Sequence, residues 1–362
     1  MMSKLDWSYR EQTKRDQIIQ KLKNDSLPVV IYGTGKFGIA VAEMLMNNDI
    51  EILCFLDKDE YWYEGKTKVV YDKTISCVNR LELSVRKEKF NLLLGMIDYS
   101  LLEPLKKEYK KCNIIEYLDA FEAHIMNDTF LSDNKEKLEC LYHQLQDQES
   151  KDVMEAYLYA RLTGDVSVLS KLCHNEKYLY DWELLEISKE DIFIDGGAYI
   201  GDSILEIKDF IGTLPKDVFA FEPDEKNLIK LLCNFSVDDL IHIHAVPAGL
   251  FEKDGEMHFL ESGTLGSKIS DEGDVSIKVV GIDDHEILKN VSAIKLDIEG
   301  SELAALKGAY NLIKANKPKL AICIYHKNED IIEIYDYLKQ FGYRFYLRQH
   351  AYSCEETVLY AI

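Results

Sequence analysis

The residues best suited to chemistry lie in a glycine-rich segment, DGGAYIGDS, directly after an apolar run in the second half of the chain. Asp195 closes the run, and Gly196, Gly197 and Gly201 let a ligand approach the backbone without meeting a Cβ atom. Tyr199 lies between these glycines. A helical pattern follows, so its first amide groups should face the same place. This segment predicts a loop that holds part of a cofactor.

The next apolar run ends at Glu222, about 20 residues beyond the glycines, as dinucleotide-binding sheets place an acidic residue. A carboxylate there can accept hydrogen bonds from both hydroxyls of a ribose. The glycine-rich turn alone would be weak evidence. The turn and Glu222 together indicate a site for an adenosine-type cofactor.

A third group of candidates follows two later apolar runs. Asp297 and Glu299 end the run in AIKLDIEGSE, and His326 ends the run in LAICIYHK. Ligands of open parallel sheets lie beyond the carboxyl ends of the strands, so the three side chains should share a crevice. We expect Asp297, Glu299 and His326 to act in catalysis, with His326 placed as a general base. The alternatives are that Asp297 and Glu299 orient their turn and that His326 is a buried structural group.

The first half of the chain carries a separate motif. Gly33, Gly35 and Gly38 follow an apolar run and open a helical pattern, and Asp57 lies nineteen residues past Gly38. This pattern matches a dinucleotide fingerprint in strand–turn–helix context. It predicts a second nucleotide site, with NAD, a regulatory nucleotide or the nucleotide of an activated sugar as ligand. The alternative is a degenerate domain that supports a dimer or the helical connector.

The elements that would position these residues form two α/β patterns. We expect a helical lead over 1–26, a Rossmann-like domain over 27–125, a helical connector over 126–190 and a second, larger α/β domain over 191–362. Candidate strands lie at 29–32, 52–56, 91–95 and 113–117, and then at 192–194, 218–221, 241–246, 293–296, 319–325, 343–347 and 357–361. Alternation over 249–260 and 275–282, with a turn at 254–255, indicates a β-hairpin.

Composition limits the classes of partner. The 362 residues have a formal net charge of −21, and residues 131–362 hold 43 acidic but only 24 basic residues. Nucleic acid and anionic membranes bind clustered Lys and Arg, so neither is expected as a partner. The eight cysteines form no C-x-x-C pair, and no metal site is expected. The absence of a signal-peptide pattern favours a cytoplasmic location.

Several of these segments resemble one family. FIDGGAYIGDS, FEP, IKLDIEGSELAALKGA and KPKLAICIYHK are similar to segments of the FkbM-type S-adenosylmethionine-dependent methyltransferases, over roughly residues 140–362. The resemblance implies a class I methyltransferase fold, a Rossmann-like seven-stranded sheet whose last strand is antiparallel. It also implies S-adenosyl-L-methionine as cofactor and methyl transfer to a hydroxyl of a carbohydrate, nucleotide-sugar or secondary metabolite.

The resemblance also assigns roles to residues. Asp195, Gly197 and Gly201 would shape the loop around the methionine part of the cofactor, Glu222 would hold the ribose, and Asp297 would lie near the transferred methyl group. Two positions depart from the family. Tyr199 stands where many members have Asn, and Ile324 stands where a carboxylate usually precedes the histidine.

The expected partner is a small-molecule or carbohydrate acceptor, and a homodimer stays open. Two other functions also stay open: an NAD(P)-dependent oxidoreductase that uses the GTGKFG loop, and a sugar-nucleotide-binding regulatory protein.

Overall fold

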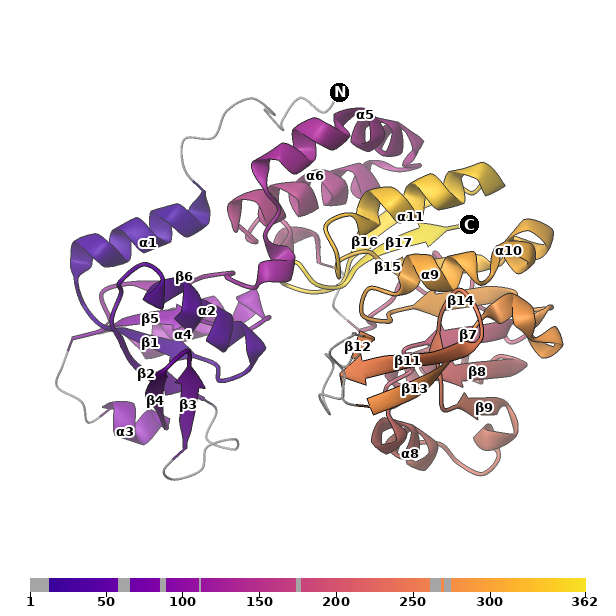
Figure 1. Ribbon diagram of the computed structural model, residues 1–362, viewed down its shortest axis with the longest axis horizontal. Coiled ribbons are helices and arrows are strands. Elements are labelled where there is room, and N and C mark those ends of the chain that lie inside the picture. The colour runs from indigo at the N-terminus through magenta and orange to yellow at the C-terminus, as the bar shows by residue number, and fades with distance from the viewer. Residues whose placement is uncertain are drawn as a thin grey trace. The chain divides into compact units, whose positions relative to one another are not determined.

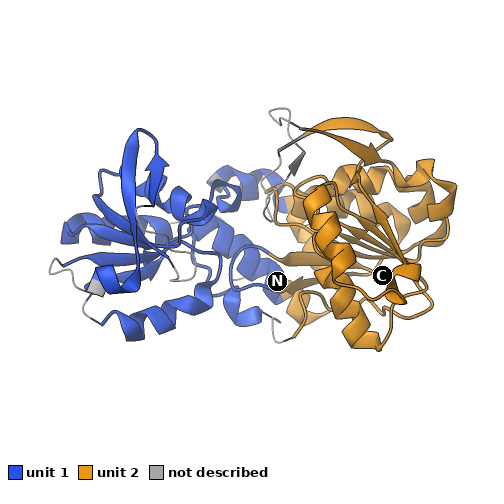
Figure 2. Ribbon diagram, turned by 90° about the horizontal axis from the view of Figure 1, so that it is seen from below, with its two compact units in different colours: residues 1–135, 152–173, 351–355 blue, residues 136–151, 174–350, 356–362 orange. Residues whose placement is uncertain are grey.

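The structure is a computed structural model that describes residues 13–57, 66–84, 89–110, 112–173, 177–260, 268–269 and 275–362 (Figure 1). The chain divides into two compact units, and each consists of three segments (Figure 2). Unit 1 comprises residues 1–135, 152–173 and 351–355, and unit 2 comprises residues 136–151, 174–350 and 356–362. The stretch expected as a connector, 126–190, therefore contributes residues to both units.

The described part of unit 1 contains a six-stranded sheet of order β3-β4-β2-β1-β5-β6. Its strands are β1 (Val29–Tyr32), β2 (Ile52–Leu56), β3 (Thr67–Val70), β4 (Lys73–Val78), β5 (Asn91–Leu94) and β6 (Ile115–Tyr117). All neighbours are parallel except the edge pair β3–β4. Every residue of β1 is buried, as expected for a central parallel strand. The predicted Rossmann-like start is confirmed, whereas the β3–β4 hairpin was not predicted.

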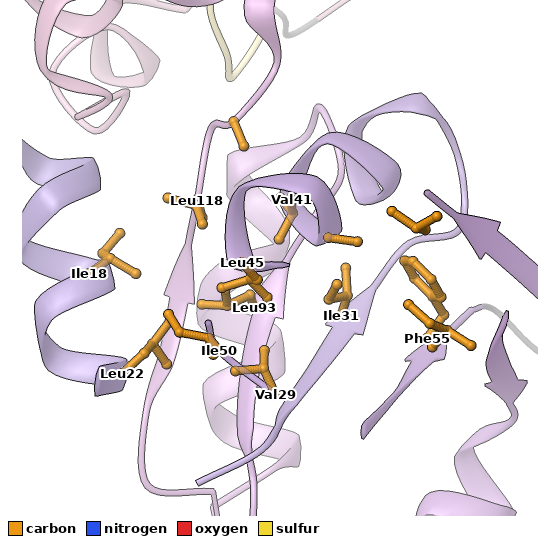
Figure 3. Packing of buried hydrophobic residues seen from close by; sticks show 14 of the residues in the cluster. Ile18, Leu22, Val29, Ile31, Val41, Leu45, Ile50, Phe55, Leu93 and Leu118 are labelled. Atoms are coloured by element: carbon orange, nitrogen blue, oxygen red, sulfur yellow. The ribbon is translucent and has the colours of Figure 1, made fainter. Parts of the chain in front are cut away.

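Helices accompany this sheet and supply much of its core. They are α1 (Lys14–Asp25), α2 (Lys36–Met46), α3 (Arg80–Ser84) and α4 (Leu102–Glu108). Thr13 and Asp16 form a capping box that begins α1, which satisfies two of its free amide groups. In Figure 3, Ile18 and Leu22 of α1 point toward the side of the sheet where Leu45 and Leu118 lie. The expected helical lead is thus, over its described residues, part of the hydrophobic core of unit 1.

Within the described residues, unit 2 is built on a seven-stranded sheet of order β16-β17-β15-β14-β7-β8-β9. Its strands are β7 (Ile192–Gly196), β8 (Asp217–Phe221), β9 (Ile243–Val246), β14 (Ala293–Leu296), β15 (Lys319–Cys323), β16 (Phe345–Gln349) and β17 (Thr357–Ala361). The last strand is antiparallel to both of its neighbours, and the pairs from β15 to β9 are parallel. The predicted class I methyltransferase topology is confirmed.

The chain leaves β7 toward β8 and β9 and then returns to β14 on the other side of β7. The carboxyl ends of β7 and β14 therefore flank a topological switch point, where ligands of such sheets bind. Helices of unit 2 are α7 (Asp202–Ile211), α8 (Glu225–Cys233), α9 (Glu302–Lys307), α10 (Tyr310–Asn316) and α11 (Asp330–Leu338). Two helices, α5 (Asp128–Gln144) and α6 (Gln148–Thr163), each contribute residues to both units.

The segment predicted as a β-hairpin forms a small separate sheet of order β10-β13-β11-β12. Its strands are β10 (Gly249–Leu250), β11 (Gly255–Leu260), β12 (Lys268–Ile269) and β13 (Val275–Val280). β11 pairs antiparallel with β13, and β10 pairs parallel with the other edge of β13, so the strands on either side of the predicted turn at 254–255 do not pair with each other. Among the described helices of the chain, none combines the length and the apolar character that crossing a membrane requires.

Candidate active site

The glycine-rich turn after β7 takes a conformation that requires particular residues. Gly197 has φ +74°, and a Cβ atom there would lie 1.9 Å from the carbonyl oxygen of Asp297. Tyr199 also has a positive φ, 45°, which is uncommon for a residue with a Cβ atom. The turn is therefore held against β14 in a strained form. Such strain often accompanies a functional site.

The other two glycines of the turn pack closely against neighbouring side chains. A Cβ atom on Gly196 would lie 2.8 Å from the Leu296 side chain, and one on Gly201 would lie 2.7 Å from the Phe235 ring. Gly201 is also the N-cap residue of α7, so the amide groups of the first turn of α7 follow directly. This arrangement supports the loop role predicted for the segment.

Glu222 follows β8 and is joined to the same turn. Its two carboxylate oxygens accept hydrogen bonds from the amide groups of Tyr199 and Asp224, both at 2.9 Å. The residue is 6% exposed, and burial raises its pKa to about 7, against the lowering effect of the two amide groups. Each carboxylate oxygen keeps a second lone pair that can accept a hydroxyl donor. This geometry fits the predicted contact with a ribose.

Asp195 lies beneath the turn and contacts a buried lysine that the sequence analysis did not single out. Lys295 Nζ lies 3.1 Å from Asp195 Oδ1 and donates to the carbonyl oxygen of Gly197 at 2.9 Å. Asp195 also accepts from the hydroxyl of Ser203, and its side chain is fully buried. Burial opposes the charge on Lys295, but Asp195 and neighbouring carboxylates outweigh burial and raise its pKa. Asp195 therefore holds the turn through Lys295, which contacts both Asp195 and the Gly197 carbonyl group.

Asp297 follows β14 and is held by two tyrosine hydroxyl groups. Tyr325 donates to Asp297 Oδ1 at 3.0 Å, and Tyr180 donates to Oδ2 at 3.4 Å. The side chain of Asp297 keeps 23% of its surface exposed, and that of Glu299 keeps 26%. Glu299 has φ +56°, a second strained residue in this region. The two carboxylates are thus accessible from solvent at the switch point.

His326 lies among three carboxylates, as the sequence predicted for two of them. Its Nε2 lies 3.3 Å from Asp297 Oδ1 and 3.7 Å from Glu299 Oε2, and its Nδ1 lies 2.9 Å from Glu302 Oε1. Burial opposes protonation of the imidazole, but the carboxylates, Glu302 first, raise its pKa to about 10. A protonated imidazole has no free nitrogen to accept a proton, so a role of His326 as a base requires that it first lose this proton.

The predicted nucleotide loop of unit 1 precedes α2 and touches β5. A Cβ atom on Gly38 would lie 2.1 Å from the carbonyl oxygen of Gly33, and one on Gly33 would lie 2.6 Å from that of Gly95. These two glycines are needed for packing. Gly35 has φ −80°, and apart from its chain neighbours no atom of the described residues lies within 4 Å of its Cβ position, so neither packing nor backbone conformation requires a glycine there. Asp57, at the end of β2, accepts from the Thr34 hydroxyl.

The comparisons with known proteins concern the sequence of this region and the fold. Residues 195–345 match the model of the methyltransferase FkbM domain. A crystal structure of methyltransferase FkbM from Methylobacillus flagellatus shares the fold, with a TM-score of 0.69 and 23% identity over 95% of this chain and 93% of that one. Residues 195–345 are thus similar in sequence to the methyltransferase FkbM domain, and the chain shares the fold of the Methylobacillus protein.

One curated protein is similar in sequence to part of this chain. The hexuronic acid methyltransferase AglP of Haloferax volcanii is 29% identical over 141 residues, which is 36% of this chain. The matched stretch spans about half (55%) of the length of that relative.

Proposed function

We propose that unit 2 binds S-adenosyl-L-methionine and transfers its methyl group to a hydroxyl group of a carbohydrate, a nucleotide-sugar or a related metabolite. The observation that carries this proposal is the hydrogen bond from the Tyr199 amide, in the strained turn, to the carboxylate of Glu222. Glu222 follows β8, the strand next to β7, so it lies beside that turn. A cofactor with a ribose and a flanking chain suits that pair of groups.

Different residues at the switch point would bind different parts of the cofactor. Glu222 would accept the ribose hydroxyl groups, and the turn from Gly197 to Gly201 would hold the methionine part of the cofactor. The cofactor supplies an activated methyl group when bound. The protein aligns the acceptor with that group, and alignment alone can supply several kcal/mol of the barrier.

The acceptor side is formed by Asp297, Glu299 and His326. Asp297 is the group best placed to receive the hydroxyl proton, since it is partly exposed and both its oxygens are oriented by tyrosine hydroxyl groups. General-base help of this kind contributes about 10²–10⁴-fold. The name of the Haloferax relative supports a carbohydrate acceptor.

The test is a transfer assay with isotopically labelled cofactor and a panel of uronic acids, neutral sugars and nucleotide-sugars. We expect label on a sugar hydroxyl group and loss of at least about 100-fold in turnover for Asp297→Asn. Label transferred by the Asp297→Asn variant at the wild-type rate would reject the role of Asp297.

A second candidate function concerns unit 1. Neither packing nor backbone conformation explains why residue 35 is a glycine. A phosphate group that approaches the backbone closely would explain it. Nucleotide binding by the loop is therefore a candidate role. Titration with ADP, NAD and a nucleotide-sugar tests it: Gly35→Val should weaken binding and leave the melting temperature unchanged, and binding equal to that of the wild type would reject the role.

A further inference from the structure

The imidazole of His326 contacts the carboxylate of Glu302. Among the described side chains, Glu302 forms an ion pair with no other. Glu302 is fully buried, and its Oε1 accepts from the amide groups of Ile298 and Gly300, at 2.9 and 3.3 Å. The same oxygen lies 2.9 Å from Nδ1 of His326. A buried carboxylate on one ring nitrogen fixes the ring so that the other nitrogen is presented to a ligand.

The presented nitrogen, Nε2, faces two carboxylates without forming a hydrogen bond to either. The side chain of His326 is 8% exposed, and its Nε2 has no hydrogen-bond partner among the described residues. A buried, polar nitrogen without such a bond is costly unless another group satisfies it. Asp297 and Glu299 approach it at 3.3 and 3.7 Å.

These separations are those of ligands around a common cation. Nitrogen and oxygen ligands lie ~2.1 Å from Zn²⁺ or similar ions, so two ligands of one ion lie roughly 3.0–3.4 Å apart at octahedral or tetrahedral angles. The contact of Nε2 with Asp297 falls in this interval, and the contact of Nε2 with Glu299, at 3.7 Å, lies about 0.3 Å beyond it. Atoms of Asp297, Glu302 and His326 lie within 4.8 Å of one another.

The charges at this place also favour a cation. Asp297, Glu299 and Glu302 contribute three negative charges around one imidazole. A fourth carboxylate, Glu356, shares the Tyr325 hydroxyl group with Asp297. Even a protonated imidazole leaves a negative excess in a largely buried place, which is unfavourable without a counter-charge.

We propose that His326 Nε2, Asp297 and Glu299 bind a divalent metal ion of the class that accepts imidazole and carboxylate together, such as Mn²⁺ or Zn²⁺. Glu302 is the positioning residue that orients the imidazole. The site was not predicted from the sequence, which has no metal motif at this spacing. Its use rests on the proposed function: the ion would bind the acceptor hydroxyl group beside the cofactor turn and lower its pKa, and the proton would pass to the carboxylate oxygen of Asp297 that does not bind the ion.

The binding itself is measured without cofactor or acceptor. The full chain, freed of metal by a chelator, is titrated with MnCl₂ and followed by electron paramagnetic resonance, and ZnCl₂ is then added as a competitor. We expect one Mn²⁺ per chain, displaced by Zn²⁺. Glu299→Gln should raise the Kd at least about tenfold, and His326→Ala should raise it further.

The matched control is His285→Ala, which removes another histidine of unit 2 paired with a carboxylate. His285 Nε2 lies 3.0 Å from Asp254 Oδ1, but that pair is exposed and belongs to no group of three metal-binding side chains among the described residues. The control should bind Mn²⁺ as the wild type does. If His326→Ala does not fold, Glu299→Gln decides, because Glu299 is partly exposed and its replacement is conservative.

Two results would overturn the proposal. One is that no Mn²⁺ binds at millimolar MnCl₂, which would mean that Nε2 of His326 carries a proton instead of a metal ion. The other is equal affinity in the wild type and the Glu299→Gln variant. Cofactor binding is titrated in a separate experiment, so a protein that binds Mn²⁺ but no S-adenosyl-L-methionine would reject the proposed function and keep the metal site.

Discussion

Replacing Lys295 with Met should destabilise unit 2 strongly, because it leaves the carboxylate of Asp195 without its cation. Lys295 is 3% exposed and Asp195 is fully buried, and their charged atoms lie 3.1 Å apart. Met has a similar length and fills the same space without a charge. The variant therefore removes an interaction rather than volume.

The size of the effect follows from the burial of both partners. Breaking a buried ion pair by removing one partner costs about 3–5 kcal/mol. In a domain of 150–250 residues, 1 kcal/mol lowers the melting temperature by about 2–4 °C, so the loss should be about 6–20 °C. The hydrogen bond from Lys295 to the carbonyl oxygen of Gly197 is lost as well, so the cofactor turn should loosen.

The assay is thermal unfolding followed by circular dichroism, with two further variants. Asp195→Asn combined with Lys295→Met removes both charges and should recover more than half of the loss. Lys208→Met is the matched control, because its pair with Asp239 leaves the lysine 40% exposed and such pairs contribute about 1 kcal/mol or less. The reasoning is refuted if Lys295→Met melts within 2 °C of the wild type, or if the double variant melts no higher than the single one.

Two further predictions concern the cofactor turn. The pKa of Glu222 is raised to about 7 by burial, so the carboxyl group is protonated at lower pH and accepts ribose hydroxyl groups less well; affinity for S-adenosyl-L-methionine should rise as the pH increases through about 7. Calorimetric titrations at pH 6 and pH 8 check this, and an equal pH dependence in Glu222→Gln would contradict it. Gly197→Ala places a Cβ atom 1.9 Å from the Asp297 carbonyl oxygen, so this variant should lose cofactor binding and melt at a lower temperature. Wild-type affinity in the Gly197→Ala variant would show that the turn tolerates the Cβ atom.

The strands and their acidic ends could be read from the sequence because buried parallel strands appear as continuous apolar runs. Such runs precede Asp195, Glu222 and Asp297, and parallel pairing brings their carboxyl ends to one edge. The β3–β4 hairpin was missed because several of its residues are exposed and half of them are polar, so neither strand forms a continuous apolar run.

Contacts between side chains far apart in the chain could not be predicted from the sequence. Lys295 is a single charge inside an apolar strand, and only the fold shows that Asp195 lies beside it. Glu302 lies at the start of α9, and its contact with His326 depends on the pairing of β14 with β15. The division of the chain into interleaved segments likewise depends on contacts between residues far apart in sequence.

The central claim is that the turn after β7 and Glu222 form a cofactor site. Isothermal titration of the full chain with S-adenosyl-L-methionine measures it most directly. We predict saturable binding of one molecule per chain, weakened by Glu222→Gln. No detectable binding at millimolar cofactor, from a protein that melts cooperatively, would contradict the claim.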